Sequence, residues 1–126
     1  MLFRSWSQVS AGSSHSLGAT SSGIAWAWGF NVNGRLGDGT TVSKTSPVSV
    51  IGGITNWSQV SAGGSHSLGV TSSGIVWAWG NNVNGQLGDG TIVSKTSPVS
   101  VIGGITNWSQ VSAGSYHSLA ITSLRV

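Results

Sequence analysis

Three histidines recur at one fixed spacing, which makes them the first residues to consider for chemistry. His15, His66 and His117 are 51 residues apart, and each follows a short turn rich in Gly and Ser. A ring of imidazoles could bind a metal ion, but the nitrogens would have to converge to about 2.1 Å from it, and no Asp, Glu or Cys stands nearby in sequence. We therefore expect structural histidines that hydrogen-bond to a turn or a neighbouring unit, and no metal site.

The two acidic residues lie in glycine-rich loops. Asp38 follows the segment Asn31-Val32-Asn33-Gly34, and Asp89 follows the same segment one spacing later. A calcium loop normally supplies several carboxylates, whereas each of these loops has one. Because Asn-Gly and Gly-Asp-Gly sequences satisfy their own backbone groups in tight turns, turn formation explains the same residues.

The sequence offers few groups that could carry out catalysis. Serine occurs throughout the chain and both acids lie in equivalent loops, so no Ser, His and Asp stand out as a triad. A pair of carboxylates for glycoside hydrolysis, a Gly-Lys-Ser phosphate loop and a dinucleotide fingerprint are also absent from the sequence. We expect no catalytic residues, no cofactor and no enzymatic activity.

Charge is sparse and dispersed along the chain. Five Lys and Arg residues stand against two Asp residues, without a local basic cluster. Nucleic-acid binding requires several phosphate contacts, so it is not expected. No run of about 18 apolar residues predicts a membrane span, and the first residues lack the apolar core of a secretory signal. The chain has no cysteine, so its composition leaves the compartment open.

A tandem repeat supplies the elements that position these residues. Residues 6–56 and 57–107 differ at only six positions, and residues 108–126 repeat the beginning of the unit. We assign an N-terminal segment 1–5, a first repeat 6–56, a second repeat 57–107 and a partial third repeat 108–126 that holds only the first hairpin. A period of about 40 to 50 residues rich in short strands is typical of propeller blades.

The pattern within the second unit predicts four strands. Residues 57–62 and 66–71 form the first two, and residues 75–79 form a third strand that is apolar on both faces. After a long loop, residues 98–102 form a short fourth strand, whose Pro98 suits the first position of a strand or a sheet edge. The expected fold class is all-β, with each blade a four-stranded antiparallel sheet.

Seven tryptophans recur with the unit. They are Trp6, Trp57 and Trp108 at the unit starts, and Trp26, Trp28, Trp77 and Trp79 in the third strands. The third-strand indoles could form a stacking platform for sugars or bases. Their alternation with small residues favours packing between blades, where each buried Trp removes about 150 to 250 Å² from water. We expect these four side chains to be mostly buried.

Five short motifs follow one another in each unit. In the second unit they are Gln59-Val60-Ser61-Ala62-Gly63, His66-Ser67-Leu68, Trp77-Ala78-Trp79-Gly80, Asn84-Gly85-Gln86-Leu87-Gly88-Asp89-Gly90 and Pro98-Val99. Together they resemble the blade consensus of the regulator-of-chromosome-condensation repeat family, over essentially the whole chain. The resemblance implies a propeller fold, typically of seven blades, and roles such as nucleotide-exchange factor, chromatin platform, photoreceptor scaffold or β-lactamase inhibitor.

Two full units and one hairpin do not suffice to close a propeller. We therefore expect blades that need other chains or further repeats, and our leading hypothesis is a structural scaffold that self-associates into a ring or filament. The alternative is a fragment of a larger propeller that binds a protein partner through its rim loops, where Phe30, Arg35, Asn81 and Gln86 differ between the units. Nucleotide exchange or chromatin binding would require charged surfaces that this chain lacks.

Overall fold

The structure is a computed structural model that describes residues 5–123. These residues contain strands, turns and loops but no helix, and therefore no helix that could cross a membrane. The predicted all-β fold class is confirmed. The predicted segment 1–5, apart from Ser5, and residues 124–126 of the partial third repeat lie outside the described residues.

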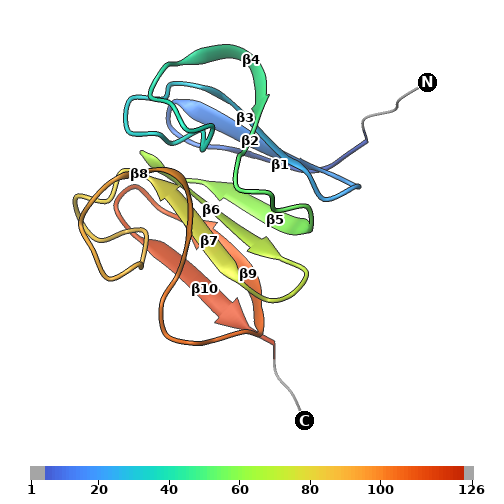
Figure 1. Ribbon diagram of the computed structural model, residues 1–126. Coiled ribbons are helices and arrows are strands. Elements are labelled where there is room, and N and C mark those ends of the chain that lie inside the picture. Colours follow the sequence, from blue (N-terminus) through green and yellow to red (C-terminus); the bar gives the residue numbers. More distant parts are fainter. Residues whose placement is uncertain (1–4, 124–126) are drawn as a thin grey trace.

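The strands form two four-stranded sheets and one hairpin, all antiparallel (Figure 1). The first sheet contains β1 (Trp6–Ala11), β2 (His15–Thr20), β3 (Ala25–Gly29) and β4 (Lys44–Ser49) in that order. The second contains β5 (Trp57–Ala62), β6 (His66–Thr71), β7 (Val76–Gly80) and β8 (Lys95–Ser100). The hairpin pairs β9 (Trp108–Ala113) with β10 (Ser118–Thr122). Neighbouring strands in sequence are thus neighbours in space, which gives each sheet a simple meander.

A tight turn between the second and third strands sets the register of each sheet. Thr20 N–H donates to the Ile24 carbonyl, and Gly23 N–H donates back to the Thr20 carbonyl, both at 2.9 Å. Gly23 has φ +86°, a conformation that L side chains rarely adopt. The turn brings Ala19 opposite Ala25, so the small and branched residues of both strands share one face.

The strand bounds agree with the sequence prediction except at the outer edge. The ranges 57–62 and 66–71 are found as predicted, and the third strand begins and ends one residue later than 75–79. The prediction of a fourth strand at 98–102 is wrong, because β8 already begins at Lys95, which pairs with Gly80. The register shifts between Ala78 and Gly80, and this irregularity accommodates Pro98 inside the outermost strand.

The sheets stack face to face and enclose two apolar cores. The first core joins Leu17, Ala19, Ala25, Ala27, Leu36 and Val50 to Trp57, Val60, Ala62 and Trp79. The second joins Leu68, Val70, Val76, Ala78 and Leu87 to Val111, with Trp108, Ala113 and Ala120 packed beside it. We call the packing of β1–β4 on β5–β8 the first junction, and that of β5–β8 on the β9–β10 hairpin the second junction.

Candidate functional site

Each full sheet has two chemically different faces because side chains alternate along a strand. The front face carries Leu17 and Ala19 in the first unit, and Leu68 and Val70 in the second. The back face carries the tryptophan that begins the unit and the Val and Ala of the same strand, which are Trp57, Val60 and Ala62 in the second unit. At both junctions the front face of one unit covers the back face of the next.

Polar side chains fasten the same faces together. Gln8 Oε1 accepts a hydrogen bond from Val60 N–H at 2.6 Å, and Ser10 Oγ accepts one from Ala62 N–H at 3.0 Å. The second junction repeats both contacts. Gln59 accepts from Val111 N–H at 2.9 Å and Ser61 from Ala113 N–H at 3.0 Å. The front side chains of one unit thereby satisfy backbone donors on the open edge of the next unit's first strand, where unpaired donors would otherwise be exposed.

The recurring histidines also connect consecutive units. His15 Nε2 lies 2.9 Å from Ser67 Oγ, and Ser67 donates its proton to the Arg35 carbonyl at 2.7 Å. Because that hydroxyl proton is used, His15 must donate from Nε2, and its buried Nδ1 has no hydrogen-bond partner among the described residues. At the second junction His66 makes the same contact with Ser118, whose hydroxyl donates to the Gln86 carbonyl.

Burial keeps these two imidazoles neutral. Desolvation, with a smaller contribution from nearby Arg35, lowers the pKa of His15 to about 4. Desolvation likewise lowers the pKa of His66 to about 4. Within residues 5–123 no three His, Cys, Asp or Glu side chains form a group that could hold a metal ion. His15 and His66 are therefore neutral hydrogen-bond donors between units.

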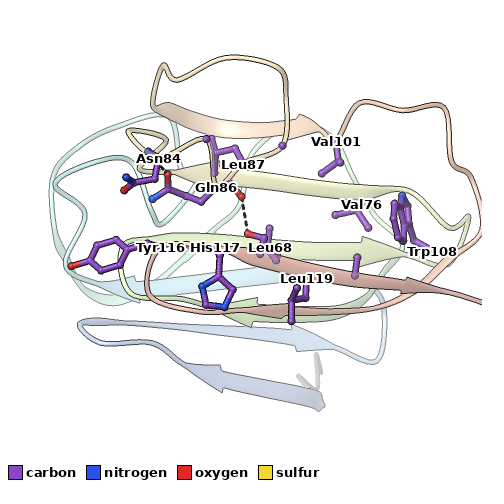
Figure 2. A pocket seen from close by; sticks show the side chains of 14 residues that line it. Leu68, Val76, Asn84, Gln86, Leu87, Val101, Trp108, Tyr116, His117 and Leu119 are labelled. Carbon is purple, nitrogen blue, oxygen red and sulfur yellow. Dashed lines mark hydrogen bonds between the residues drawn. The ribbon is translucent and has the colours of Figure 1, made fainter.

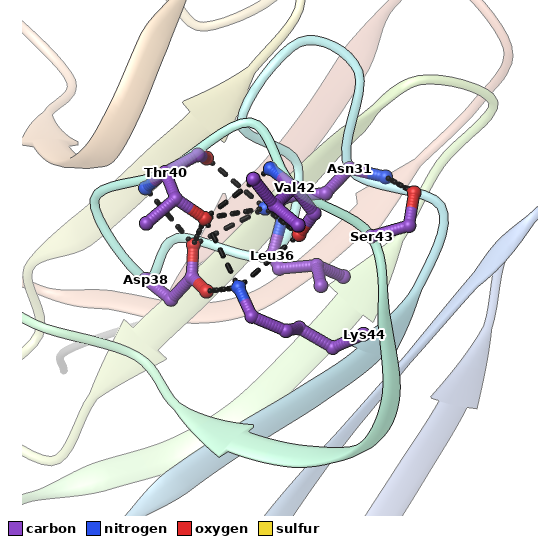
Figure 3. A network of polar contacts seen from close by, with 7 residues as sticks. All are labelled: Asn31, Leu36, Asp38, Thr40, Val42, Ser43 and Lys44. Carbon is purple, nitrogen blue, oxygen red and sulfur yellow. Dashed lines mark hydrogen bonds and ion pairs between the residues drawn. The ribbon is translucent and has the colours of Figure 1, made fainter.

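The Asn and Asp of the long loop organise that loop (Figure 3). Asn31 Nδ2 donates to Asp38 Oδ1 and to the carbonyls of Thr40 and Val42 at 3.0–3.1 Å. The second carboxylate oxygen of Asp38 lies 2.6 Å from Lys44 Nζ. Burial would raise the pKa of Asp38, but the hydrogen bonds from Lys44 and Thr40 outweigh burial and lower the pKa. Asn82, Asp89 and Lys95 repeat the arrangement.

The first unit covers the tryptophan pair of the second unit, whereas the described residues leave the equivalent pair of the first unit uncovered. Trp79 is 0% exposed and its ring centroid lies 5.5 Å from that of Trp57. Trp6 and Trp28 form the equivalent pair at 6.0 Å on the back face of the first unit, where Trp6 is 43% exposed. The expectation of burial holds fully for Trp79 and in part for Trp26, Trp28 and Trp77, which are half-buried. Trp108 is half-buried at the second junction.

The predicted rim-loop residues lie at very different depths. Phe30 is 45% exposed and Asn81 is half-buried, whereas Arg35 and Gln86 are 5% and 4% exposed. Arg35 donates to Ser14 Oγ and to the Gly64 carbonyl of the next unit, and its guanidinium lies 5.0 Å from the Phe30 ring centroid. A binding role for the four residues stays a prediction. The contact from Arg35 to the next unit was not predicted, although Phe30 and Arg35 change together between the units.

At one end of the stack a back face is exposed, and at the other end a front face is exposed. On the back face of the first unit, Trp6 and Val9 are 43% and 68% exposed, and Ala11 is exposed as well. On the front face of the hairpin, Leu119 and Ile121 are 63% and 56% exposed. A shallow hollow of about 180 Å³ lies on that face, between Leu119, Ile121, Gln110 and Ser112.

A larger cavity of about 330 Å³ lies at the second junction (Figure 2). Its apolar wall comes from both sides of the junction: Leu68, Val76, Leu87 and Val101 from the second unit, and Trp108 and Leu119 from the hairpin. Tyr116 and His117 lie at one end of it in Figure 2. At the first junction the covering element is the four-stranded sheet β5–β8, whereas at the second it is the two-stranded β9–β10 hairpin.

The stacked four-stranded meanders define this molecule as a set of propeller blades. Two models of the regulator of chromosome condensation (RCC1) repeat match the chain, one over residues 22–70 and 73–121 and the other over residues 6–35 and 57–86. The chain therefore belongs to the RCC1 repeat family, as the sequence motifs indicated.

Several known proteins are similar over nearly the whole chain. The human E3 ubiquitin-protein ligase HERC2 is 39% identical over 125 residues, which cover 94% of this chain but 2% of HERC2. The Arabidopsis thaliana ultraviolet-B receptor UVR8 is 41% identical over 93 residues, covering 73% of this chain and 21% of UVR8. The chain thus spans a small part of these relatives.

Solved structures share the fold. Human WBSCR16 superposes with a TM-score of 0.82 at 22% identity, covering 94% of this chain and 31% of that one. Prp20p from Saccharomyces cerevisiae gives a TM-score of 0.82 at 20% identity, covering 93% and 31%. The predicted architecture of propeller blades that do not close into a ring is confirmed.

Proposed function

We propose that this chain is a non-enzymatic, protein-binding scaffold whose units, residues 6–56, 57–107 and 108–126, associate head to tail with a second copy. The observation that carries this proposal is that residues exposed at the two ends of the stack occupy the same repeat positions as residues buried at the junctions. Val9 is 68% exposed, whereas Val60, its counterpart at the first junction, is 2% exposed. Leu119 is 63% exposed, whereas its counterparts Leu17 and Leu68 are at most 1% exposed.

The polar contacts of the junctions support the same docking geometry. Gln110 and Ser112 are exposed on β9 and correspond to Gln8 and Ser10, which bind backbone donors of the next unit. In a head-to-tail contact they would accept from Val9 and Ala11 N–H of the second copy. Apolar contacts and hydrogen bonds to the backbone would then form on the same surface, as they do at the two junctions within the chain.

Head-to-tail contacts use two different surfaces of each copy. Repetition of such a contact gives a closed ring when the rotation closes and a filament when it does not. A ring has one mass over a range of concentrations, whereas the mean mass of a filament grows with concentration.

Light scattering after size exclusion tests this proposal. We expect the intact chain to exceed the mass of a monomer at micromolar concentrations, and the variant Val9→Lys to be monomeric because a charge would be buried in the contact. The matched substitution Val32→Lys, at a loop position that is 54% exposed, should leave the mass unchanged. A monomeric intact chain at these concentrations would contradict the proposal.

We also propose that these repeats have no catalytic activity. The polar groups that recur with the unit are engaged in contacts within the fold, since His15 and His66 bind serines of the next unit and Asp38 binds Lys44. Three similar proteins are ligases by name, and the chain covers only 2% to 12% of their lengths. Ligase activity is therefore not proposed for these repeats.

A second candidate function is the binding of another protein through the long loops. These loops carry exposed apolar side chains: Phe30, Val32 and Val42 in the first unit, and Val83, Ile92 and Val93 in the second. The similar structure Prp20p has binding properties toward Gsp1p and histones, and Kap60 binds it as well. A partner of this chain held through the loops should be lost in the pair Phe30→Ser and Val83→Ser, with the oligomeric mass unchanged. Retention of the partner by that variant would exclude the loops.

A further inference from the structure

The first junction shows which residues occupy the place of the large cavity when the covering sheet has four strands. A Cβ atom on Gly37 would lie 2.8 Å from Trp79 Nε1, so the indole rests directly on the backbone of the first unit's loop. A Cβ atom on Gly34 would lie 2.6 Å from Thr96 Cα in β8. Gly39 N–H donates to the Thr96 carbonyl at 2.9 Å. Strands β7 and β8 thus cover the loop of the preceding unit.

The equivalent positions at the second junction are open. A Cβ atom on Gly85, the counterpart of Gly34, would have no described atom within 4 Å. The three described atoms nearest to a Cβ atom on Gly88, the counterpart of Gly37, all belong to Val101 of the same unit. The cavity is lined by Gly88, Val101 and Trp108, which correspond to Gly37, Val50 and Trp57 around Trp79. The walls of the cavity therefore match the residues that surround the Trp79 indole at the first junction.

A free strand edge runs beside this cavity. Strand β6 pairs with β5 on one side and with β7 on the other, whereas β10 pairs with β9 alone among the described strands. The residues of β10 that line the cavity, Ser118, Leu119 and Ala120, belong to that edge. An unpaired edge next to an apolar cavity has the two components that β-strand addition requires, backbone groups for affinity and a pocket for a side chain.

We propose that the cavity and the β10 edge together bind an extended segment of the Trp-Ala-Trp-Gly type. The second tryptophan of that segment enters the cavity, and its backbone pairs antiparallel with β10. The register follows from β6 and β7, where Ser67 faces Trp79 and His66 faces Gly80. The second tryptophan is therefore placed opposite Ser118, and the glycine opposite His117.

This inference rests on the proposed function and deepens it by naming the chemistry of one ligand. Its cavity shares Leu119 with the exposed front face of the hairpin. The end faces proposed for self-association carry Val9 and Ile121, which are not among the residues that line the large cavity. Binding of the segment can therefore be measured in the Val9→Lys chain, where the head-to-tail contact is removed. Failure of one proposal is then distinguishable from failure of the other.

The test is a binding titration with a fluorescein-labelled peptide of residues 74–82. We expect saturable binding to the full chain, weakened at least about ten-fold when the peptide carries Trp79→Ala, because the indole supplies most of the buried contact. The peptide with Trp77→Ala is the matched control and should lose less. In the protein, Val101→Phe should fill the cavity and weaken binding similarly, whereas Ile102→Phe, at a neighbouring residue that is 63% exposed, should not.

Hydrogen exchange separates strand addition from simple uptake of an aromatic ring. The bound peptide should slow exchange of the β10 amides that face away from β9, and free indole should not. No saturable binding of the peptide, equal binding of the Trp79→Ala peptide, or binding without protection of β10 would each overturn the proposal. Because the peptide variants leave the protein unchanged, they decide between these outcomes even if the Val101→Phe chain fails to fold.

Discussion

The two junctions of this chain share their first-strand and histidine contacts and differ at the third strand. Both use the Gln and Ser side chains of a first strand and the His–Ser bond to the next unit. Only the first adds a buried Trp79 and the Arg35 contact to Gly64. The hairpin alone is therefore sufficient for the polar alignment of successive units, whereas dense apolar packing requires the third and fourth strands.

The largest expected difference between the junctions comes from Trp79. Trp79→Ala should lower the free energy of unfolding by about 3 to 5 kcal/mol, since the side chain is 0% exposed between two units. Trp28→Ala, at the equivalent position on the uncovered back face, should cost about 1 kcal/mol, the value of an aromatic pair. Urea denaturation measures both. Equal costs would mean that Trp79 does not hold the junction together.

Acid should weaken both junctions through their shared histidines. The folded-state pKa of His15 and of His66 is about 4, below the unfolded value near 6.5, so the unfolded chain takes up protons first as pH falls. Stability is therefore fully present above about pH 6.5 and declines toward pH 4, by a few kcal/mol in total.

Urea midpoints between pH 7 and pH 4 test this dependence. The chain with His15→Gln and His66→Gln keeps a donor at each site without a titrating ring, so its midpoint should vary less over this window. The pKa values of Asp38 and Asp89 are lowered, so their contribution is lost only at lower pH. A wild-type midpoint that stays constant down to pH 4 would show that the imidazoles are not held neutral.

A smaller effect is expected from transferring the Arg35 contact to the second junction. Ser65 Oγ, the counterpart of Ser14 Oγ, is buried without a described hydrogen-bond partner. Gln86→Arg together with Asn81→Phe should supply that partner and stabilise the chain by about 1 kcal/mol, and Arg35→Gln should destabilise it by a similar amount. Thermal unfolding checks both changes. If the gain persists with Ser65→Ala, the new arginine does not act through that hydroxyl.

Local patterns allowed much of the fold to be predicted. Strands β5 and β6 were found because their apolar positions alternate and a Gly-rich turn separates them. The start of β8 was missed because Lys95-Thr96-Ser97 is polar and is held as a strand by pairing with β7 and by contact with the preceding unit. The contact of Arg35 could not be deduced from its loop alone, since its acceptor Gly64 lies in the next unit. Contacts between units depend on the stacking, which local sequence does not specify.

The head-to-tail claim is tested most directly by mixing two chains with opposite blocked faces. Val9→Lys blocks the exposed back face of the first unit, and Ile121→Lys blocks the exposed front face of the hairpin. We predict that each variant alone is a monomer by light scattering. An equimolar mixture should form a complex of one copy of each, because the Val9→Lys chain keeps its front face and the Ile121→Lys chain keeps its back face. Two monomers that stay separate in the mixture, or a variant that still associates alone, would contradict head-to-tail docking.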